Sequence, residues 1–393
     1  MKILMVLDHE FPSDVRVENE ALSLITAGHQ VHLACYTRKD RPRKDFFRGI
    51  IIHRVPVSTL LYKASVAVLT VPLYFKFWKR FLDKIITEND IEAIHIHDLP
   101  LAQVGKVLKF RYNLKLVVDL HENWPAMLRV STHTKSIRGR LLSPYFLWER
   151  YEKRVLCHAD IIIVVVKESQ ERLIREGVDN SKIFVVSNTL NEDNFHLPLV
   201  KPDPNYYTLY YAGGITCHRG LQTVIEAISL VKDRIPHIRL RITGSGKYAE
   251  PLRDLVKKKD LTNHVEFTGY LTLEEVARNL ALADAALIPH LKSSHTDSTI
   301  PHKIFQYMYA NKPVIASNCV PMERIISETN SGVIFKSGSA EDLAEKLLAL
   351  YEKRITVLPA RKWVEEKYNW DADARILVAL YDKLQTALSY HDG

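Results

Sequence analysis

Long hydrophobic runs are missing from this sequence of 393 residues. A helix that crosses a bilayer needs about 18 consecutive apolar residues. The nearest candidate, residues 64–75, is shorter and contains Ser65, Thr70 and Pro72. The first apolar run, residues 3–7, is followed at once by Asp8, which makes it too short for a signal peptide. We therefore expect no membrane span and no leader. The four scattered cysteines, which suggest no disulfide framework, favour a reducing, cytoplasmic location.

Cysteine, glycine and proline are also scarce. There are only 14 Gly and 17 Pro, while 47% of residues are hydrophobic and 25% are charged, which excludes a disordered or fibrous chain. No two of the four cysteines form a Cys-x-x-Cys pair, which argues against a disulfide framework and a structural zinc site. At about 100–200 residues per domain, the length favours two domains.

The net charge of +8 is concentrated in one segment. Residues 38–84 contain twelve Lys or Arg against three Asp, a surplus of nine, so the rest of the chain is nearly neutral. Within it, residues 57–84 interleave apolar and basic side chains, which is typical of a helix lying on an anionic membrane. A helix that buries its apolar side against a sheet explains the pattern about as well. Nucleic acid is the less favoured partner, because no recognition module accompanies the charge.

Short β-branched runs alternate with segments of helical period along the whole chain, which is typical of parallel sheets covered by helices on both faces. A first series occupies residues 1–196 and a second occupies 205–370, separated by three prolines in residues 197–204. Residues 371–393 contain one amphipathic helix that could return to the first domain. The predicted fold is therefore α/β, with two doubly wound Rossmann-like domains facing across a cleft.

Two glycine turns in the second domain suggest an anion site. Gly213 and Gly214 follow one strand and Arg219 precedes the next helix, so backbone N–H groups and a forked cation suit a diphosphate. A second turn, Gly244-Ser245-Gly246, follows the next strand. A tight strand-to-helix turn with a surface arginine is the alternative interpretation.

The stretch Asp297-Ser298-Thr299-Ile300-Pro-His-Lys303 predicts a further helix N-terminus at the cleft. Ser298 or Thr299 can cap this helix and Pro301 can occupy its first turn, which would place Lys303 near a bound anion. A well-capped amphipathic helix without a ligand accounts for the same pattern.

These marks, with Phe267-Thr-Gly-Tyr270 and the later Lys312-Pro-Val-Ile315, resemble the GT-B glycosyltransferases of the large retaining family 4 over nearly the whole chain. The resemblance assigns the donor diphosphate to Arg219 and Lys303. It also shows a departure: the family's usual pair of glutamates falls on Ser298 and Gln306, and an expected arginine falls on Gly214. Asp297, Ser298 and backbone N–H groups would then hold the sugar, and Gln306 a ribose hydroxyl.

The resemblance implies roles in the first domain as well. Val117-Val-Asp119-Leu-His121-Glu122 is similar to the family's Asp-x-His-Glu segment, whose histidine contacts the transferred sugar. His121 is therefore the candidate catalytic residue with Asp119 orienting its ring; a structural Asp–His bond is the alternative.

The acceptor side would include Glu122, His97, Asp14 and Arg16, the last two matching a family branch with Asp-x-Arg in this loop. A helix-capping Asp with a solvated Arg is nearly as good an interpretation. His95 and His97 on one strand face could suggest a metal, but no third ligand follows at a recognisable spacing, so we predict no metal site.

The resemblance predicts a retaining transferase that uses a UDP- or GDP-type sugar donor and no cofactor. Its acceptor would be a saccharide or lipid-linked saccharide in cell-surface polysaccharide or glycolipid assembly, and the enzyme would be cytoplasmic, with attachment to the inner membrane face as an option. The alternatives are a GT-B sugar-nucleotide epimerase and a nucleotide-binding subunit without catalysis.

Overall fold

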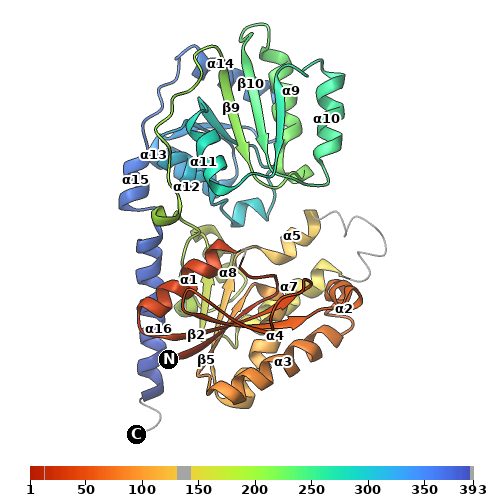
Figure 1. The fold of residues 1–393 in the computed structure, drawn as a ribbon, viewed down its shortest axis with the longest axis vertical. Coiled ribbons are helices and arrows are strands. Elements are labelled where there is room, and N and C mark those ends of the chain that lie inside the picture. The colour runs from red at the N-terminus through yellow and green to blue at the C-terminus, as the bar shows by residue number, and fades with distance from the viewer. Residues whose placement is uncertain (13, 131–142, 390–393) are drawn as a thin grey trace. The chain divides into compact units, whose positions relative to one another are not determined.

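The computed structural model describes residues 1–12, 14–130 and 143–389 (Figure 1). The chain divides into two compact units, Met1–Ser187 with Asp371–Gly393, and Asn188–Trp370. Each unit is a mainly parallel sheet flanked by helices. The division falls after Ser187, earlier in the chain than the proline-rich segment 197–204.

The first unit contains an eight-stranded sheet in the order β3-β4-β2-β1-β5-β6-β7-β8. Its strands are β1 (Lys2–Leu7), β2 (Gln30–Thr37), β3 (Lys44–Phe47), β4 (Ile50–Pro56), β5 (Ala93–His97), β6 (Lys115–Leu120), β7 (Ile161–Val164) and β8 (Ile183–Val185). Every pairing is parallel except that of β3 with β4. Buried β-branched runs such as β7 explain this arrangement, since strands covered on both faces are apolar throughout.

The helices of the first unit pack on this sheet. They are α1 (Val15–Thr26), α2 (Thr59–Ala64), α3 (Leu73–Asn89), α4 (Ala102–Tyr112), α5 (Trp124–Val130), α7 (Tyr145–Leu156), α8 (Lys167–Arg175) and α16 (Trp370–Ser389). The last, long helix returns to this unit, where the carboxylate of Asp373 accepts a bond from the N–H of Ser187 at 2.8 Å. Asp373 thereby ties the end of the chain to the loop after β8.

The second unit contains a six-stranded sheet in the order β11-β10-β9-β12-β13-β14. The strands are β9 (Tyr207–Ala212), β10 (Ile238–Thr243), β11 (Val265–Gly269), β12 (Ala285–Ile288), β13 (Val314–Ser317) and β14 (Gly332–Phe335), all parallel. The helices are α9 (Leu221–Val231), α10 (Ala249–Lys258), α11 (Leu273–Ala281), α12 (Lys303–Tyr309), α13 (Val320–Thr329), α14 (Ala340–Tyr351) and α15 (Arg361–Glu366). Counted along this unit, the strand order is the 3-2-1-4-5-6 of nucleotide-binding folds, whose ligands bind where the order reverses.

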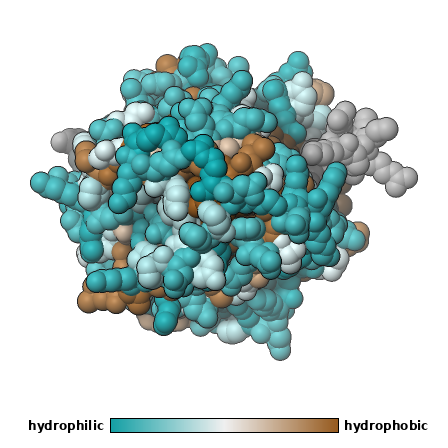
Figure 2. Space-filling model, turned by 90° about the horizontal axis from the view of Figure 1, so that it is seen from above, coloured by the Kyte–Doolittle hydropathy of each residue, from teal (hydrophilic) through white to brown (hydrophobic). Residues whose placement is uncertain are grey.

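The surface in Figure 2 is mostly hydrophilic, with smaller hydrophobic areas between the polar ones. Within the part of the chain that the structure describes, no helix combines the length and the apolarity that crossing a membrane requires.

Candidate active site

The strand order of the second unit reverses between β9 and β12, and the two glycine turns meet at this edge of the sheet. The N–H of Gly213 donates to Thr243 at 2.9 Å, and the N–H of Ile215 donates to Ser245 at 2.9 Å. A Cβ on Gly244 would lie 2.0 Å from the Gly213 carbonyl oxygen, so this residue must be glycine for the turns to touch. Ser245 is exposed. Gly246 is equally confined, by the carbonyl of Ile215.

Gly213 itself faces a lysine. Its φ of +146° favours glycine, and a Cβ there would lie 2.6 Å from Nζ of Lys303. Nothing lies within 4 Å of the corresponding position on Gly214. The backbone at Gly214 therefore has open space in which a ligand could lie. At Gly213 the corresponding space is filled by the ammonium group of Lys303.

Two basic side chains, Arg219 and Lys303, lie near the glycine turns, and neither contacts a carboxylate among the described residues. Nη1 of Arg219 lies 2.9 Å from Nε2 of His290, and Nζ of Lys303 lies 4.2 Å from the ring centroid of Tyr211. Within the described ranges, neither cation forms an ion pair with Asp or Glu. Desolvation and the nearby Arg219 hold the pKa of Lys303 well below its usual range. An anion bound here would meet the guanidinium of Arg219, which no carboxylate neutralises, and would favour the charged form of Lys303.

The loop before α12 differs from its prediction. The helix begins at Lys303 with no side-chain cap, so the expected cap from Ser298 or Thr299 is wrong. The physical reason is local: residues 296–298 form a turn of their own, and Thr299 is extended. Oγ of Ser298 then donates to the carbonyl of Ser294 at 2.9 Å.

The other residues of this loop that were predicted to bind the donor sugar are either hydrogen-bonded within the protein or buried. Oδ1 of Asp297 accepts from the N–H of Val320 at 3.0 Å, at the start of α13. Ile300 and Gln306 are buried. The structure thus brings Gly213, Arg219 and Lys303 together, while the side chain of Asp297 binds the start of α13 and that of Ser298 binds its own loop.

In the first unit, His121 lies just beyond the carboxyl end of β6. Its Nε2 lies 2.7 Å from Oδ2 of Asp119, and its Nδ1 lies 3.7 Å from Oδ2 of Asp98. The ring keeps 15% of its side-chain surface exposed. Burial opposes a charge on this ring, but the two carboxylates outweigh it and raise the pKa of His121 to about 10. His121 is therefore an imidazolium at neutral pH.

Arg16 and His97, predicted to line an acceptor surface, are instead buried behind His121, at 6% and 1% exposure. Arg16 donates from Nε and Nη2 to both oxygens of Asp119, at 3.1 and 3.0 Å. The solvated interpretation of Arg16 is therefore wrong, and its role on the acceptor side stays a prediction. Asp14 caps α1 by accepting from the N–H groups of Arg16 and Val17, and Glu122 remains half-buried.

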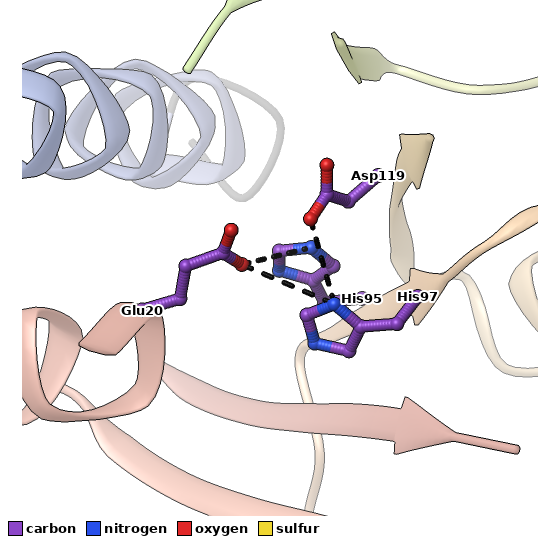
Figure 3. Close-up of side chains that lie close together, drawn as sticks. All are labelled: Glu20, His95, His97 and Asp119. Carbon is purple, nitrogen blue, oxygen red and sulfur yellow. Dashed lines mark ion pairs between the residues drawn. The ribbon is translucent and has the colours of Figure 1, made fainter. Parts of the chain in front are cut away.

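Figure 3 shows four side chains that lie close together: Glu20 from α1, His95 and His97 from β5, and Asp119 from β6. The sequence did not predict that Glu20 joins the two histidines. Nε2 of His95 lies 3.7 Å from Oε2 of Glu20, and Nδ1 of His97 lies 3.5 Å from Oδ2 of Asp119. One ligand atom from each residue falls within 4.8 Å of the others, a set that could hold a transition metal.

A guanidinium already occupies the carboxylates of this cluster. Nη2 of Arg16 lies 3.0 Å from Oε1 of Glu20 and 3.0 Å from Oδ1 of Asp119. Burial and the neighbouring Asp119 raise the pKa of Glu20 well above its usual range, while Arg16 favours its charged form. A divalent ion would compete with Arg16 for both carboxylates, so the cluster fits an internal ion pair better than a metal.

Asp8 and Asp98 follow the neighbouring strands β1 and β5, where the order of the first sheet reverses. Burial raises the pKa of Asp8 to about 7 and that of Asp98 to about 6. The hydroxyl of Tyr74 donates to Asp8. Neither carboxyl was predicted to belong to the site; their position directly after a strand was the available signal.

Comparison with known protein families gives two matches that together span most of the chain. Residues 14–194 match the family described as Glycosyltransferase Family 4, and residues 194–370 match Glycosyl transferases group 1.

Individual relatives are distant. An uncharacterized glycosyltransferase of Methanocaldococcus jannaschii is 23% identical over 98% of this chain and 99% of its own. The amylovoran biosynthesis glycosyltransferase AmsK of Erwinia amylovora is 26% identical over 63% of this chain and 62% of its own.

Solved structures share the fold. Sucrose-phosphate synthase from Thermosynechococcus elongatus has a TM-score of 0.79 at 18% identity, covering 98% of this chain and 99% of that one. WaaG, a glycosyltransferase involved in lipopolysaccharide biosynthesis, has a TM-score of 0.71 at 15% identity, covering 95% and 98%. The predicted GT-B fold is thereby confirmed.

Proposed function

Since the chain belongs to the group 1 glycosyltransferases of family 4, we propose that it is a retaining enzyme that moves a sugar from a nucleoside diphosphate sugar to an acceptor hydroxyl. The observation that carries the proposal is the pair of basic side chains without a carboxylate partner, Arg219 and Lys303, at the point where the second sheet reverses its strand order. A UDP- or GDP-type donor supplies the two phosphates that this charge suits.

The cations serve the step in which the donor bond breaks. As the sugar C1–O bond breaks, negative charge grows on the departing diphosphate, and Arg219 and Lys303 stabilise it in place of a metal. The acceptor oxygen bonds to C1 on the same face, and its proton passes to an oxygen of the departing phosphate. The products are the glycoside and a protonated nucleoside diphosphate, so atoms and charge balance without a carboxylate nucleophile.

His121 contributes to the same step from the first unit. As an imidazolium held by Asp119, it donates a hydrogen bond to a hydroxyl of the transferred sugar. Because its contact is with the sugar, it affects turnover more than nucleotide affinity.

The test measures nucleotide binding and sugar transfer separately. The wild type should be stabilised against heat by UDP or GDP, and Arg219→Ala and Lys303→Ala should each lose about 2–5 kcal/mol of donor affinity. Unchanged donor affinity in both variants would refute the diphosphate site. Activity that a chelator abolishes and a divalent metal restores would refute the metal-free mechanism.

A nucleotide sugar incubated with the protein but without an acceptor distinguishes the remaining functions. A transferase leaves the sugar's configuration unchanged, whereas an epimerase converts it. Binding without any turnover, with or without acceptors, would identify a nucleotide-binding subunit; the neutral Ser298 and Gln306 at the family's glutamate positions motivate that outcome.

We further propose that the acceptor is a saccharide or lipid-linked saccharide of surface polysaccharide or glycolipid assembly, and that the first unit docks on an anionic membrane. AmsK, named for amylovoran biosynthesis, and WaaG, named for lipopolysaccharide biosynthesis, support the acceptor class. Lys63, Lys76 and Arg80 are exposed in the basic segment and support the docking.

A further inference from the structure

His290, two residues beyond the end of β12, holds the guanidinium of Arg219 in the second unit. Its Nε2 lies 2.9 Å from Nη1 of Arg219, and the side chain is 3% exposed. A guanidinium has only donors, so Nε2 accepts this bond with its lone pair. His290 is therefore neutral when it contacts Arg219.

The surroundings of His290 enforce that neutrality. Burial is the largest effect that disfavours a positive charge on the imidazole of His290. The neighbouring basic groups act in the same direction; they are Arg219, Lys303, His218 and His295. Together they hold the pKa of His290 well below its usual range.

The backbone fixes this contact from both sides. Gly220, with φ +72°, lies so close to β12 that a Cβ would be 1.8 Å from the carbonyl oxygen of Pro289. The N–H of Leu291 donates to the carbonyl of His218 at 2.9 Å, and Oγ of Ser317 donates to the carbonyl of His290 at 2.5 Å. The loop carrying Arg219 and the loop carrying His290 are thus one hydrogen-bonded piece.

Arg16 of the first unit is buried, whereas Arg219 is half-buried, and the two guanidinium groups have opposite kinds of partner. Arg16 is held by the carboxylate of Asp119 at 3.0 Å, which cancels its charge. Arg219 is held by a neutral imidazole, which fixes its direction and leaves its charge available. A neutral partner in place of a carboxylate has a functional consequence only if an anion binds to Arg219.

We propose that His290 is a positioning residue that orients Arg219 toward the donor diphosphate without neutralising it. The proposal rests on the proposed donor function and names a residue that this function requires. Its consequence is specific: the charge of the acceptor at position 290 controls donor affinity.

The test compares two variants of nearly the same shape. His290→Gln keeps a neutral acceptor near Nε2, whereas His290→Glu adds a carboxylate that pairs with Arg219. Affinities for UDP and for GDP are measured by titration calorimetry on the full chain. We expect His290→Gln to bind within a few-fold of wild type and His290→Glu to bind about 10- to 100-fold more weakly.

A matched control changes the charge elsewhere in the unit. His237 is exposed and precedes β10, at the edge of the sheet opposite the site, so His237→Glu should leave nucleotide affinity unchanged. Thermal melting without nucleotide gives a second readout: His290→Glu should melt no lower than His290→Gln, because it gains an ion pair with Arg219.

Some results would overturn the positioning role of His290, and others would test the proposed function on which it rests. Wild-type nucleotide affinity in both variants would show that the charge at position 290 is irrelevant. An equal loss of nucleotide affinity in both variants would show that the imidazole has a merely structural role. A wild type that binds UDP or GDP and shows the expected pattern, yet transfers no sugar, would refute the transferase function alone. A wild type that binds neither nucleotide would refute both.

Discussion

Lys303 is a lysine whose charge depends on its ligand. Desolvation and the nearby Arg219 lower its pKa in the free protein, and a bound diphosphate would raise it again because the anion favours the charged form. Between the two pKa values, nucleotide binding takes up a proton. Affinity should therefore fall as the pH rises above the pKa of the free protein, by up to about tenfold per pH unit for one proton.

We expect the heat of UDP or GDP binding to differ between buffers of different ionisation enthalpy, measured by calorimetry between about pH 7 and pH 10. Lys303→Arg is the matched control, because it keeps a cation that stays protonated throughout this range. The same buffer dependence in this variant would assign the proton to another group, and no buffer dependence in the wild type would show that Lys303 is already charged.

The neighbours of His121 allow a second prediction, at the same scale. Its pKa of about 10 keeps it charged across neutral pH, so turnover should be level there and fall as the pH rises through about 10. Asp119→Asn removes the carboxylate that outweighs burial, so the basic limb should move to lower pH and turnover at neutral pH should fall. Nucleotide affinity should stay nearly unchanged, which is measured alongside kcat.

Glu20→Gln provides the control for this experiment. Glu20 and Asp119 both contact Arg16, but only Asp119 also contacts His121 at 2.7 Å, so an amide of the same shape at position 20 should leave the basic limb nearly in place. A shift as large as that of Asp119→Asn would show that Glu20 carries the charge. If neither variant moves the basic limb of the pH profile of turnover, the ionisation of His121 does not control the rate.

At the scale of elements, the sequence predicted most strands and several caps, because these depend on local patterns. The strands β1, β9 and β14 each coincide with a short apolar or β-branched run, and Thr272 and Glu275, whose spacing is that of a capping box, form one at α11. The strand β3 was missed: Lys44–Phe47 is short and mostly exposed, so no apolar run marks it. The start of α12 was wrong since capping residues were present in sequence but engaged in a preceding turn.

Contacts between distant elements set the limit of prediction for the site. Glu20 shares one face of α1 with Val17, Ala21 and Leu24, a spacing that could have marked it as buried. Nothing in that spacing shows that the same carboxylate meets His95 from β5. The glycine turns and the basic residues near them were predictable, because each lies within one strand-to-helix connection. The contact of His290 with Arg219 joins two such connections, so the sequence could not predict it.

At the scale of the whole molecule, the concentration of basic charge in one segment bears on where the enzyme works. The structure changes the basis of the docking proposal, because most apolar residues of this segment face inward. Val68 and Trp78 are buried, and Leu61, Leu69, Phe75, Phe77 and Phe81 pack partly against the same core. Leu60 and Leu73 remain exposed, at 81% and 58%, as does the neighbouring Val71.

Docking would therefore rely on exposed cations with a few apolar side chains beside them. Lys79 is not among the free cations, since it pairs with Asp83 at 2.9 Å. Lys63, Lys76 and Arg80 are exposed, and each basic residue near an anionic surface contributes about 1 kcal/mol. Three such residues support reversible attachment that weakens with salt.

Sedimentation with vesicles tests this docking, and a matched triple variant separates a local surface from net charge. The wild type should sediment with anionic vesicles at low salt and not with neutral ones. Replacing Lys63, Lys76 and Arg80 by Glu should abolish this, whereas Glu at Lys257, Lys258 and Lys259, exposed at the end of α10, changes the net charge equally and should preserve it. Equal loss in both triple variants would mean that only overall charge matters. A wild type that stays in the supernatant at low salt would contradict the docking and favour an acceptor that is not in a membrane.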